Sequence, residues 1–204
     1  MADPVGHSAS VPVPVEELVA ARLDDVRAVA GRLAEPDLLA ATARVAEVFV
    51  GCYRDGGRVV LFGNGGSAAD AAHVAAEFVG RCTRDRPPLP ALALTEGLAT
   101  VTAVGNDYGY EEVFARQLRA HARQGDVVVA LSTSGRSPNV LRGLAEARAL
   151  GLATVGLTGG DAGGFPGLVD HLLVAPSADT ARIQEVHQTW CHIWVEAVEA
   201  ALFG

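Results

Sequence analysis

The stretch "RVVLFGNGGSAADAAHVAAEF", residues 58 to 78, places a short apolar run directly before a glycine-rich turn and a helical pattern. The run 58–62 is β-branched and uniformly apolar, which is typical of a strand buried on both faces of a parallel sheet. Glycine allows the tight backbone turn that leads from such a strand into a helix. The stretch therefore predicts the first strand-turn-helix unit of an α/β fold.

The same alternation continues along the chain. Further apolar runs lie at residues 91–94, 126–131, 153–157 and 171–175. Helical patterns lie at 16–33, 37–54, 67–79, 111–123, 138–150 and 179–202. This order predicts a three-layer αβα sandwich around a five-stranded parallel sheet of the flavodoxin-like type, with two N-terminal helices and a long C-terminal helix. Ligands of such folds bind at the carboxyl ends of the strands.

Length and composition predict a single domain over residues 15–204. The chain has 204 residues, 50% of them hydrophobic, which suffices for one sizeable core. Residues 1–14 are rich in Pro, Ser, Ala and Val and are expected to form a flexible tail. We expect a cytoplasmic protein that contacts no membrane, because we find no secretory signal pattern and no apolar run of roughly 18 residues. The odd number of cysteines, three, also suits reduced thiols.

The charge balance excludes several functions. A net charge of −8 argues against binding nucleic acid, which needs clustered cations. All 16 basic residues are Arg, so a lysine Schiff base and a P-loop phosphate clamp are both excluded.

The turn after the first strand has the spacing of a dinucleotide-binding motif. Gly63, Gly65 and Ala68 give G-x-G-x-x-A, but the acidic residue expected roughly 20 residues later is missing from the basic, proline-rich segment 81–90. A turn that needs glycine for its backbone alone is the plainer alternative. Asn64 and Ser67 favour a binding role, because they add polar side chains where helix amides face outward.

A second polar turn, "LSTSGRSPNV" at 131–140, follows the third apolar run. Pro138 suits the first position of a helix and Ser137 its N-cap. Hydroxyl groups and free helix amides can hold a phosphomonoester without lysine. An ordinary serine-rich connection is the alternative. The hydroxyl residues in question are Ser132, Thr133, Ser134 and Ser137.

Two helices carry side chains that could share a metal ion. His73 and Glu77 are four residues apart and face one way. Gln184, Gln188 and His192 form a polar stripe through the otherwise apolar last helix. Nitrogen and oxygen donors of this kind suit zinc. A surface His–Glu contact and a core histidine are the alternative, and the spacing does not choose between Gln184 and Gln188.

Together the segments 63–81, 105–118, 131–140 and 180–192 resemble the sedoheptulose 7-phosphate isomerase (phosphoheptose isomerase) family, which has the sugar isomerase (SIS) fold. The H-x-x-x-E helix combined with R-I-Q-E-x-H, and a histidine eight residues after its glutamine, carries most of the resemblance. It implies conversion of D-sedoheptulose 7-phosphate to D-glycero-D-manno-heptose 7-phosphate, the first step of nucleotide-activated heptose biosynthesis. It also implies a homotetramer with sites near subunit contacts.

The resemblance assigns roles to individual residues. One zinc ion per subunit would be held by His73, Glu77, Gln184 and His192. The residues that would contact substrate are Asn64, Gly65, Gly66, Ser67, Asn106, Asp107, Ser132, Thr133, Ser134, Ser137 and Gln184.

Aldose–ketose isomerisation through an enediol needs a base for a carbon-bound proton and an acid for the oxygen proton. We assign Glu77 as the base and His192 as the acid, although a metal bond would lower the basicity of Glu77. Two other functions are compatible with the fold. Some relatives are non-enzymatic scaffolds that associate with the bacterial replication initiator, and a sugar-phosphate sensor would keep the hydroxyl loop. Neither function needs the four metal-ligand candidates together.

Overall fold

The structure, a computed structural model, describes residues 13–204. Most of the predicted tail, residues 1–12, lies outside the described residues. The helices are α1 (Val15–Arg32), α2 (Pro36–Arg54), α3 (Gly66–Val79), α4 (Leu98–Tyr108), α5 (Val113–His121), α6 (Pro138–Ala149) and α7 (Thr180–Phe203). The strands are β1 (Val59–Gly63), β2 (Ala91–Ala93), β3 (Val127–Leu131), β4 (Ala153–Gly159) and β5 (His171–Ala175).

All five strands pair in parallel in the order β2-β1-β3-β4-β5, which confirms the predicted flavodoxin-like sheet. The central strands β1 and β3 are buried along their whole length, as their uniformly apolar sequences predict. The register pairs Val59 with Val127 and Gly63 with Leu131, so both strands end at the same edge. The turns that follow them are therefore neighbours.

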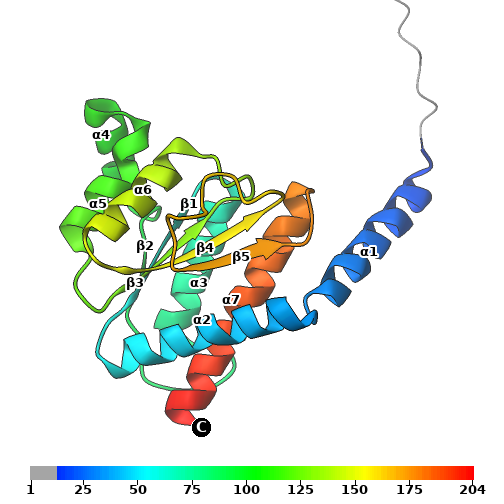
Figure 1. Cartoon of the computed structure of the whole chain (residues 1–204), viewed down its shortest axis with the longest axis horizontal. Coiled ribbons are helices and arrows are strands. Elements are labelled where there is room, and N and C mark those ends of the chain that lie inside the picture. Colours follow the sequence, from blue (N-terminus) through cyan, green and yellow to red (C-terminus); the bar gives the residue numbers. More distant parts are fainter. Residues whose placement is uncertain (1–12) are drawn as a thin grey trace, which may run out of the picture.

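Side chains alternate along the strands between two cores. Leu61 and Val129 face a core shared with α2, α3 and α7, whereas Val60 and Val128 face a second core shared with α5 and α6. Figure 1 shows the helices on the two faces of the sheet, which confirms the three-layer architecture.

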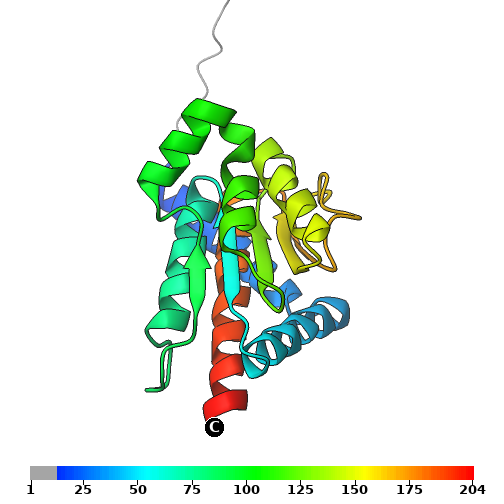
Figure 2. The same ribbon diagram turned by 90° about the vertical axis from the view of Figure 1, so that its left-hand side faces the viewer.

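Two helices stand apart from these layers. Neither α1 nor α4 contains a buried residue. α1 extends from the body as an arm (Figure 1), and α4 projects beyond the helical layer above α5 (Figure 2). α4 was not predicted, and the helix predicted at 111–123 is divided into a 3-10 turn, Tyr110–Glu112, and α5. Within residues 13–204, no helix is both long and apolar enough to cross a membrane.

Candidate active site

The sheet has a switch point between β1 and β3. β2 lies on one side of β1, and β3 leads to β4 and β5 on the other side. Connections leave such a pair of strands in opposite directions, and the crevice they leave at the carboxyl edge is where open α/β sheets bind ligands. The turns at 63–66 and 131–137 flank this crevice.

The turn after β1 is built around Gly65, whose φ of 56° favours glycine. Asn64 and Asn139, at the start of α6, exchange two amide hydrogen bonds of 2.8 and 2.9 Å. The Tyr110 hydroxyl donates to Asn64 Oδ1 at 3.2 Å. Asn64 therefore ties the two turns together, a role that its position in sequence did not reveal.

The four hydroxyl residues of the turn after β3 differ in their exposure to solvent. Ser132 is buried, Thr133 and Ser137 are half-buried and Ser134 is exposed. Ser137 occupies the predicted N-cap position of α6, with Pro138 at the first helical position, but its side chain makes no capping hydrogen bond. Its hydroxyl lies 3.4 Å from the Ser132 hydroxyl. The Asn139 side chain accepts from the Val140 amide at 3.0 Å in place of Ser137, so among the described residues the Ser137 hydroxyl has only Ser132 as a side-chain partner.

A cavity of about 210 Å³ adjoins this turn. Thr133 and Ser134 line it together with the glycines after β4 and the start of α7. Arg136 at its rim pairs with Asp161, and this hydrogen bond is the main cause of the lowered pKa of the Asp161 carboxyl. The cavity combines hydroxyls with one partly neutralised cation, which suits a small anion.

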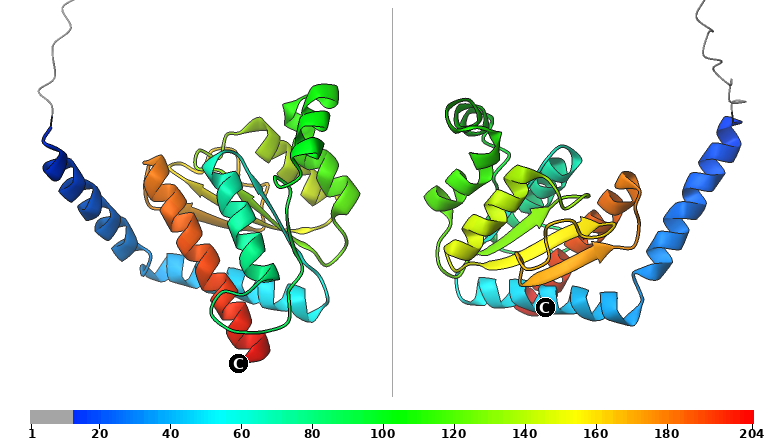
Figure 3. Two further views of the ribbon diagram at one scale, coloured as in Figure 1. Left: turned by 180° about the vertical axis from the view of Figure 1, so that it is seen from behind. Right: turned by 45° about the horizontal axis from the view of Figure 1, so that its top comes forward.

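The side chains predicted to share a metal ion meet across α3 and α7. Both helices begin at the carboxyl edge of the sheet and run side by side (Figure 3). The Nε2 atoms of His73 and His192 are 2.9 Å apart, and Glu77 Oε1 lies 3.8 Å from His73 Nε2. The His73 and Glu77 side chains are 39% and 22% exposed, so the group is open to solvent. The spacing of the residues predicted that His73 and Glu77 share one face of α3, and the fold brings His192 of α7 against that face.

Gln184 lies elsewhere along the same pair of helices. A Cβ atom added to Gly66 would lie 2.2 Å from Gln184 Nε2, so this side chain rests on the first turn of α3. Gln184 and His192 are eight residues apart, which is about 12 Å along a helix axis. Gln184 thus faces the glycine turn, and the two histidines lie farther along the groove between the helices.

Three donor atoms converge at the histidine pair, and their chemistry suits zinc. Two nitrogen ligands of a tetrahedral zinc ion at about 2.05 Å would stand about 3.3 Å apart. The observed 2.9 Å is a direct hydrogen bond between the rings, and no cluster of three or more His, Cys, Asp or Glu side chains in residues 13–204 is arranged to hold a metal ion. The two histidine nitrogens would fit zinc after a separation of the rings by a few tenths of an ångström.

Asn106 and Asp107 lie at the exposed end of α4, where the Asn106 amide donates to Asp107 at 2.8 Å. Tyr110, just beyond, links this end to Asn64 through its hydroxyl. Tyr110 therefore connects the segment after α4 to the crevice.

Two polar residues near the histidine pair were not predicted. Asp70 lies one turn before His73 with a buried carboxylate oxygen that has no partner among the described residues. Burial raises the pKa of Asp70, and His73 partly opposes the shift. Cys82 lies beside Glu77: burial first, and then a hydrogen bond with the Glu77 carboxylate, raise the Cys82 pKa to about 11. The helical spacing from His73 could have identified Asp70, but no sequence signal identifies Cys82.

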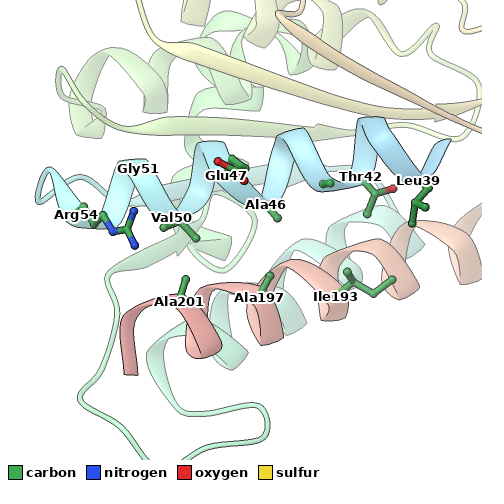
Figure 4. A pocket seen from close by; sticks show the side chains of 11 residues that line it. Leu39, Thr42, Ala46, Glu47, Val50, Gly51, Arg54, Ile193, Ala197 and Ala201 are labelled. Carbon is green, nitrogen blue, oxygen red and sulfur yellow. The ribbon is translucent and has the colours of Figure 1, made fainter. Parts of the chain in front are cut away.

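A larger groove lies apart from this site, between α2 and α7 (Figure 4). It measures about 670 Å³ and contains none of the predicted site residues. Small side chains such as Ala46, Ala197 and Ala201 line most of it, with Glu47 and Arg54 at its edge. This groove is therefore separate from the smaller cavity and from the histidine pair.

The fold, the hydroxyl-rich turn and the comparison with known families define the class. Residues 12–159 match the SIS domain family. The phosphoheptose isomerase of Burkholderia pseudomallei is 50% identical over 178 residues, which cover 87% of this chain and 90% of that protein. The chain belongs to the phosphoheptose isomerase family.

Solved structures of this family agree with the fold. A phosphoheptose isomerase from Francisella tularensis superimposes with a TM-score of 0.88 at 33% identity, covering 92% of this chain and 100% of that one. The enzyme from Neisseria gonorrhoeae gives a TM-score of 0.86 at 37% identity, with the same coverage. The similarity extends over the whole α/β domain.

Proposed function

We propose that this chain is an aldose–ketose isomerase that converts D-sedoheptulose 7-phosphate to D-glycero-D-manno-heptose 7-phosphate in heptose biosynthesis. The observation that carries the proposal is the meeting of His73, Glu77 and His192 across α3 and α7, in a fold whose turn after β3 lines a small cavity with hydroxyl groups. A scaffold has no use for this solvent-open arrangement. A sugar-phosphate sensor needs the cavity but no base.

The reaction moves one proton between two carbons. Glu77 removes a proton from C1 of the ketose, and the electron pair of that bond forms the C1–C2 double bond of an enediol as O2 takes up a proton from His192. O1 then gives up its proton as the C1 carbonyl forms, and Glu77 returns a proton to C2. Each residue ends in its starting state, because the imidazole recovers the O1 proton.

The phosphate group is assigned to residues 132–137. Ser132, Thr133, Ser134 and Ser137 supply hydroxyl donors, and α6 supplies the positive end of its dipole. Gly65 and Gly66 allow close approach of the sugar backbone, with Asn64, Ser67, Asn106, Asp107 and Gln184 as further polar contacts. Anchoring at one end orients the reacting carbons toward Glu77.

We assign one zinc ion per subunit to His73, Glu77 and His192, with Gln184, the fourth ligand that the family resemblance implies, turning away from Gly66 and along the groove to reach the ion. When bound, zinc would polarise the substrate oxygens as a Lewis acid. Elemental analysis of dialysed protein, with and without a chelator, tests this assignment. Full activity of verifiably metal-free protein would make these four residues polar substrate contacts instead.

The protein is proposed to act in the cytoplasm as a homotetramer with sites near subunit contacts. α1 and α4 bury no residue within the chain, and Leu18, Leu23 and Leu98 on them are 48%, 52% and 74% exposed. Exposed apolar helices of this kind mark interaction surfaces. Light scattering should give four times the 21.1 kDa chain mass, and a monomeric mass would contradict the assignment.

The proposed function is tested by incubating zinc-supplemented protein with D-sedoheptulose 7-phosphate and following the aldose by NMR. D-fructose 6-phosphate serves as a matched sugar with one carbon less. We expect turnover of the seven-carbon sugar. Binding of the seven-carbon sugar without aldose formation would favour the sensor, and neither binding nor turnover would favour the scaffold.

A further inference from the structure

A fully buried ion pair lies at the end of α3 that carries Glu77. Arg86 Nε donates to Glu199 Oε1 at 3.2 Å, and both side chains are 0% exposed. Arg86 comes from the segment between α3 and β2, and Glu199 from the last turns of α7. The pair therefore joins the two helices that carry the candidate catalytic residues.

The rest of the Arg86 guanidinium binds the backbone of α3. Nη2 donates to the carbonyl of Glu77 at 2.9 Å, and Nη1 donates to the carbonyl of Phe78 at 2.6 Å. These carbonyls belong to the last turn of a helix, where no amide of the helix itself can bond them. Arg86 thus caps α3 through the backbone of Glu77 itself.

Glu199 holds the other side of the same segment. Its carboxylate accepts hydrogen bonds from the backbone amides of Cys82, Thr83 and Arg84, at 2.9 to 3.1 Å. Burial alone would raise the pKa of Glu199, but these hydrogen bonds outweigh it and hold the value at about 2. The carboxylate is ionised at neutral pH and keeps Cys82 beside the Glu77 side chain.

We propose that Arg86 and Glu199 are positioning residues that fix Glu77 relative to α7, Arg86 through the Glu77 carbonyl and Glu199 through the Cys82 segment. His192 and Glu199 are seven residues apart on α7, two helical turns, and so lie on nearly one face. Arg86 and Glu199 together, called the clamp below, therefore set the position of Glu77 relative to His192. This inference rests on the proposed function, since it assigns the clamp to the same site.

A buried ion pair is not by itself evidence of a stabilising design, because its desolvation cost can cancel its attraction. A positioning role explains why the Arg86 guanidinium binds the carbonyls of Glu77 and Phe78 and the carboxylate of Glu199 at the same time. Lysine cannot reproduce this, since its ammonium group is a single point with no planar fork. Displacing a catalytic group by about 1 Å can lower the rate about 100-fold.

The test compares Arg86→Lys with the control Arg58→Lys. Arg58 also pairs with a buried carboxylate, Asp126, at 3.0 Å, but at the amino ends of β1 and β3. We expect Arg86→Lys to lower kcat by at least tenfold with KM within twofold of the parent, because the phosphate turn is untouched. Arg58→Lys should keep the parental kcat per folded molecule.

Hydrogen exchange supplies a readout independent of activity. Amides of residues 80–84 should exchange at least tenfold faster in Arg86→Lys than in the parent or Arg58→Lys. Parental kcat in Arg86→Lys, at a temperature where it is folded, would overturn the proposal. If Arg86→Lys does not fold, Glu199→Gln replaces it with the same expected changes, and a parental kcat there overturns the proposal equally. A parent that turns over no sugar refutes the proposed function instead, and unchanged exchange in the folded variant would then refute the clamp separately.

Discussion

Ser137 occupies the N-cap position of α6, but its side chain does not cap the helix. A role in helix stability can therefore be distinguished from a role in binding phosphate. An N-cap serine whose side chain bonds the helix amides contributes about 1 kcal/mol to stability. The Ser137 hydroxyl makes no such bond and lies 3.4 Å from the Ser132 hydroxyl. The proposed role of Ser137 is therefore to bind the phosphate rather than to stabilise the helix.

Ser137→Ala is therefore expected to cost less than about 0.5 kcal/mol of unfolding free energy and to raise KM by about tenfold, the loss of one bond to a charged group. Asp179→Ala is the control, because Asp179 caps α7 through its side chain, at 2.8 Å from the Ala181 amide. That variant should lose about 1 kcal/mol. Denaturant titration and steady-state kinetics check both, and an unchanged KM in Ser137→Ala would place the phosphate elsewhere.

His187 gives the fold a pH dependence of its own. It is 0% exposed, and its Nε2 donates to the Thr158 carbonyl at 3.1 Å. Burial lowers the pKa of His187 to about 4, although this hydrogen bond partly opposes the shift. Between pH 6.5 and pH 4, His187 is protonated in the unfolded chain, where a histidine pKa is about 6.5, but stays neutral in the folded chain.

Stability should therefore fall as the pH drops from about 6.5 toward 4, by up to about 1.4 kcal/mol per pH unit. His187→Gln removes the titration and should flatten this part of the curve in urea unfolding at pH 7 and pH 5. Glu199, whose pKa is lowered from 4.5 to about 2, contributes stability that is lost as the pH falls from 4.5 toward 2, mostly below this window. An equal slope in parent and variant would show that His187 is not the group responsible.

Among the elements, the strands were the most predictable. The five apolar runs coincide with β1 to β5 within two residues at each end, and the pattern is cleanest in β1 and β3, which are buried on both faces. α4 was missed because "LATVTAVGNDY" has no buried face, and threonine, valine and glycine are weak helix formers. Only Val101 and Val104 of α4 are partly buried against the core, which leaves too short an apolar pattern to read as a helix.

The candidate site residues could be named from the sequence, but their arrangement in space could not. Four-residue spacing put His73 and Glu77 on one face of α3, yet nothing in the spacing brought His192 to 2.9 Å from His73, since that contact crosses two helices far apart in sequence. The resemblance to a family supplied that pairing. Arg86 and Glu199 were not predicted at all, because an ion pair 113 residues apart has no local pattern.

The close packing of Gln184 on Gly66 makes the contact between α3 and α7 testable. Gly66→Ala would place a Cβ 2.2 Å from Gln184 Nε2, the far end of a flexible side chain, which can move aside at little cost in stability. We expect an unchanged melting temperature and a fall in kcat/KM of about tenfold, the value of one lost polar contact. Gln184→Ala should show the same fall, and the double variant should be no worse than either single one. Parental kinetics in Gly66→Ala would remove Gln184 from the site.

At the scale of the molecule, the open candidate site and the uncovered apolar surface are both consistent with the proposed tetramer. The histidine pair opens to solvent, while two helices and the groove between α2 and α7 expose apolar side chains that the chain itself does not cover. A tetramer would cover such surface and enclose the reacting carbons. Exclusion of water in this way would strengthen the electrostatic interactions of the site.

The central claim is that Glu77 transfers the carbon-bound proton of a seven-carbon sugar phosphate. The most direct test is the initial rate of aldose formation from D-sedoheptulose 7-phosphate, followed by NMR for the parent and Glu77→Gln at equal metal content. Glutamine keeps the shape but accepts no proton, so kcat should fall about 10² to 10⁴-fold with KM little changed. A parental rate in Glu77→Gln, or no aldose from the parent, would contradict the account.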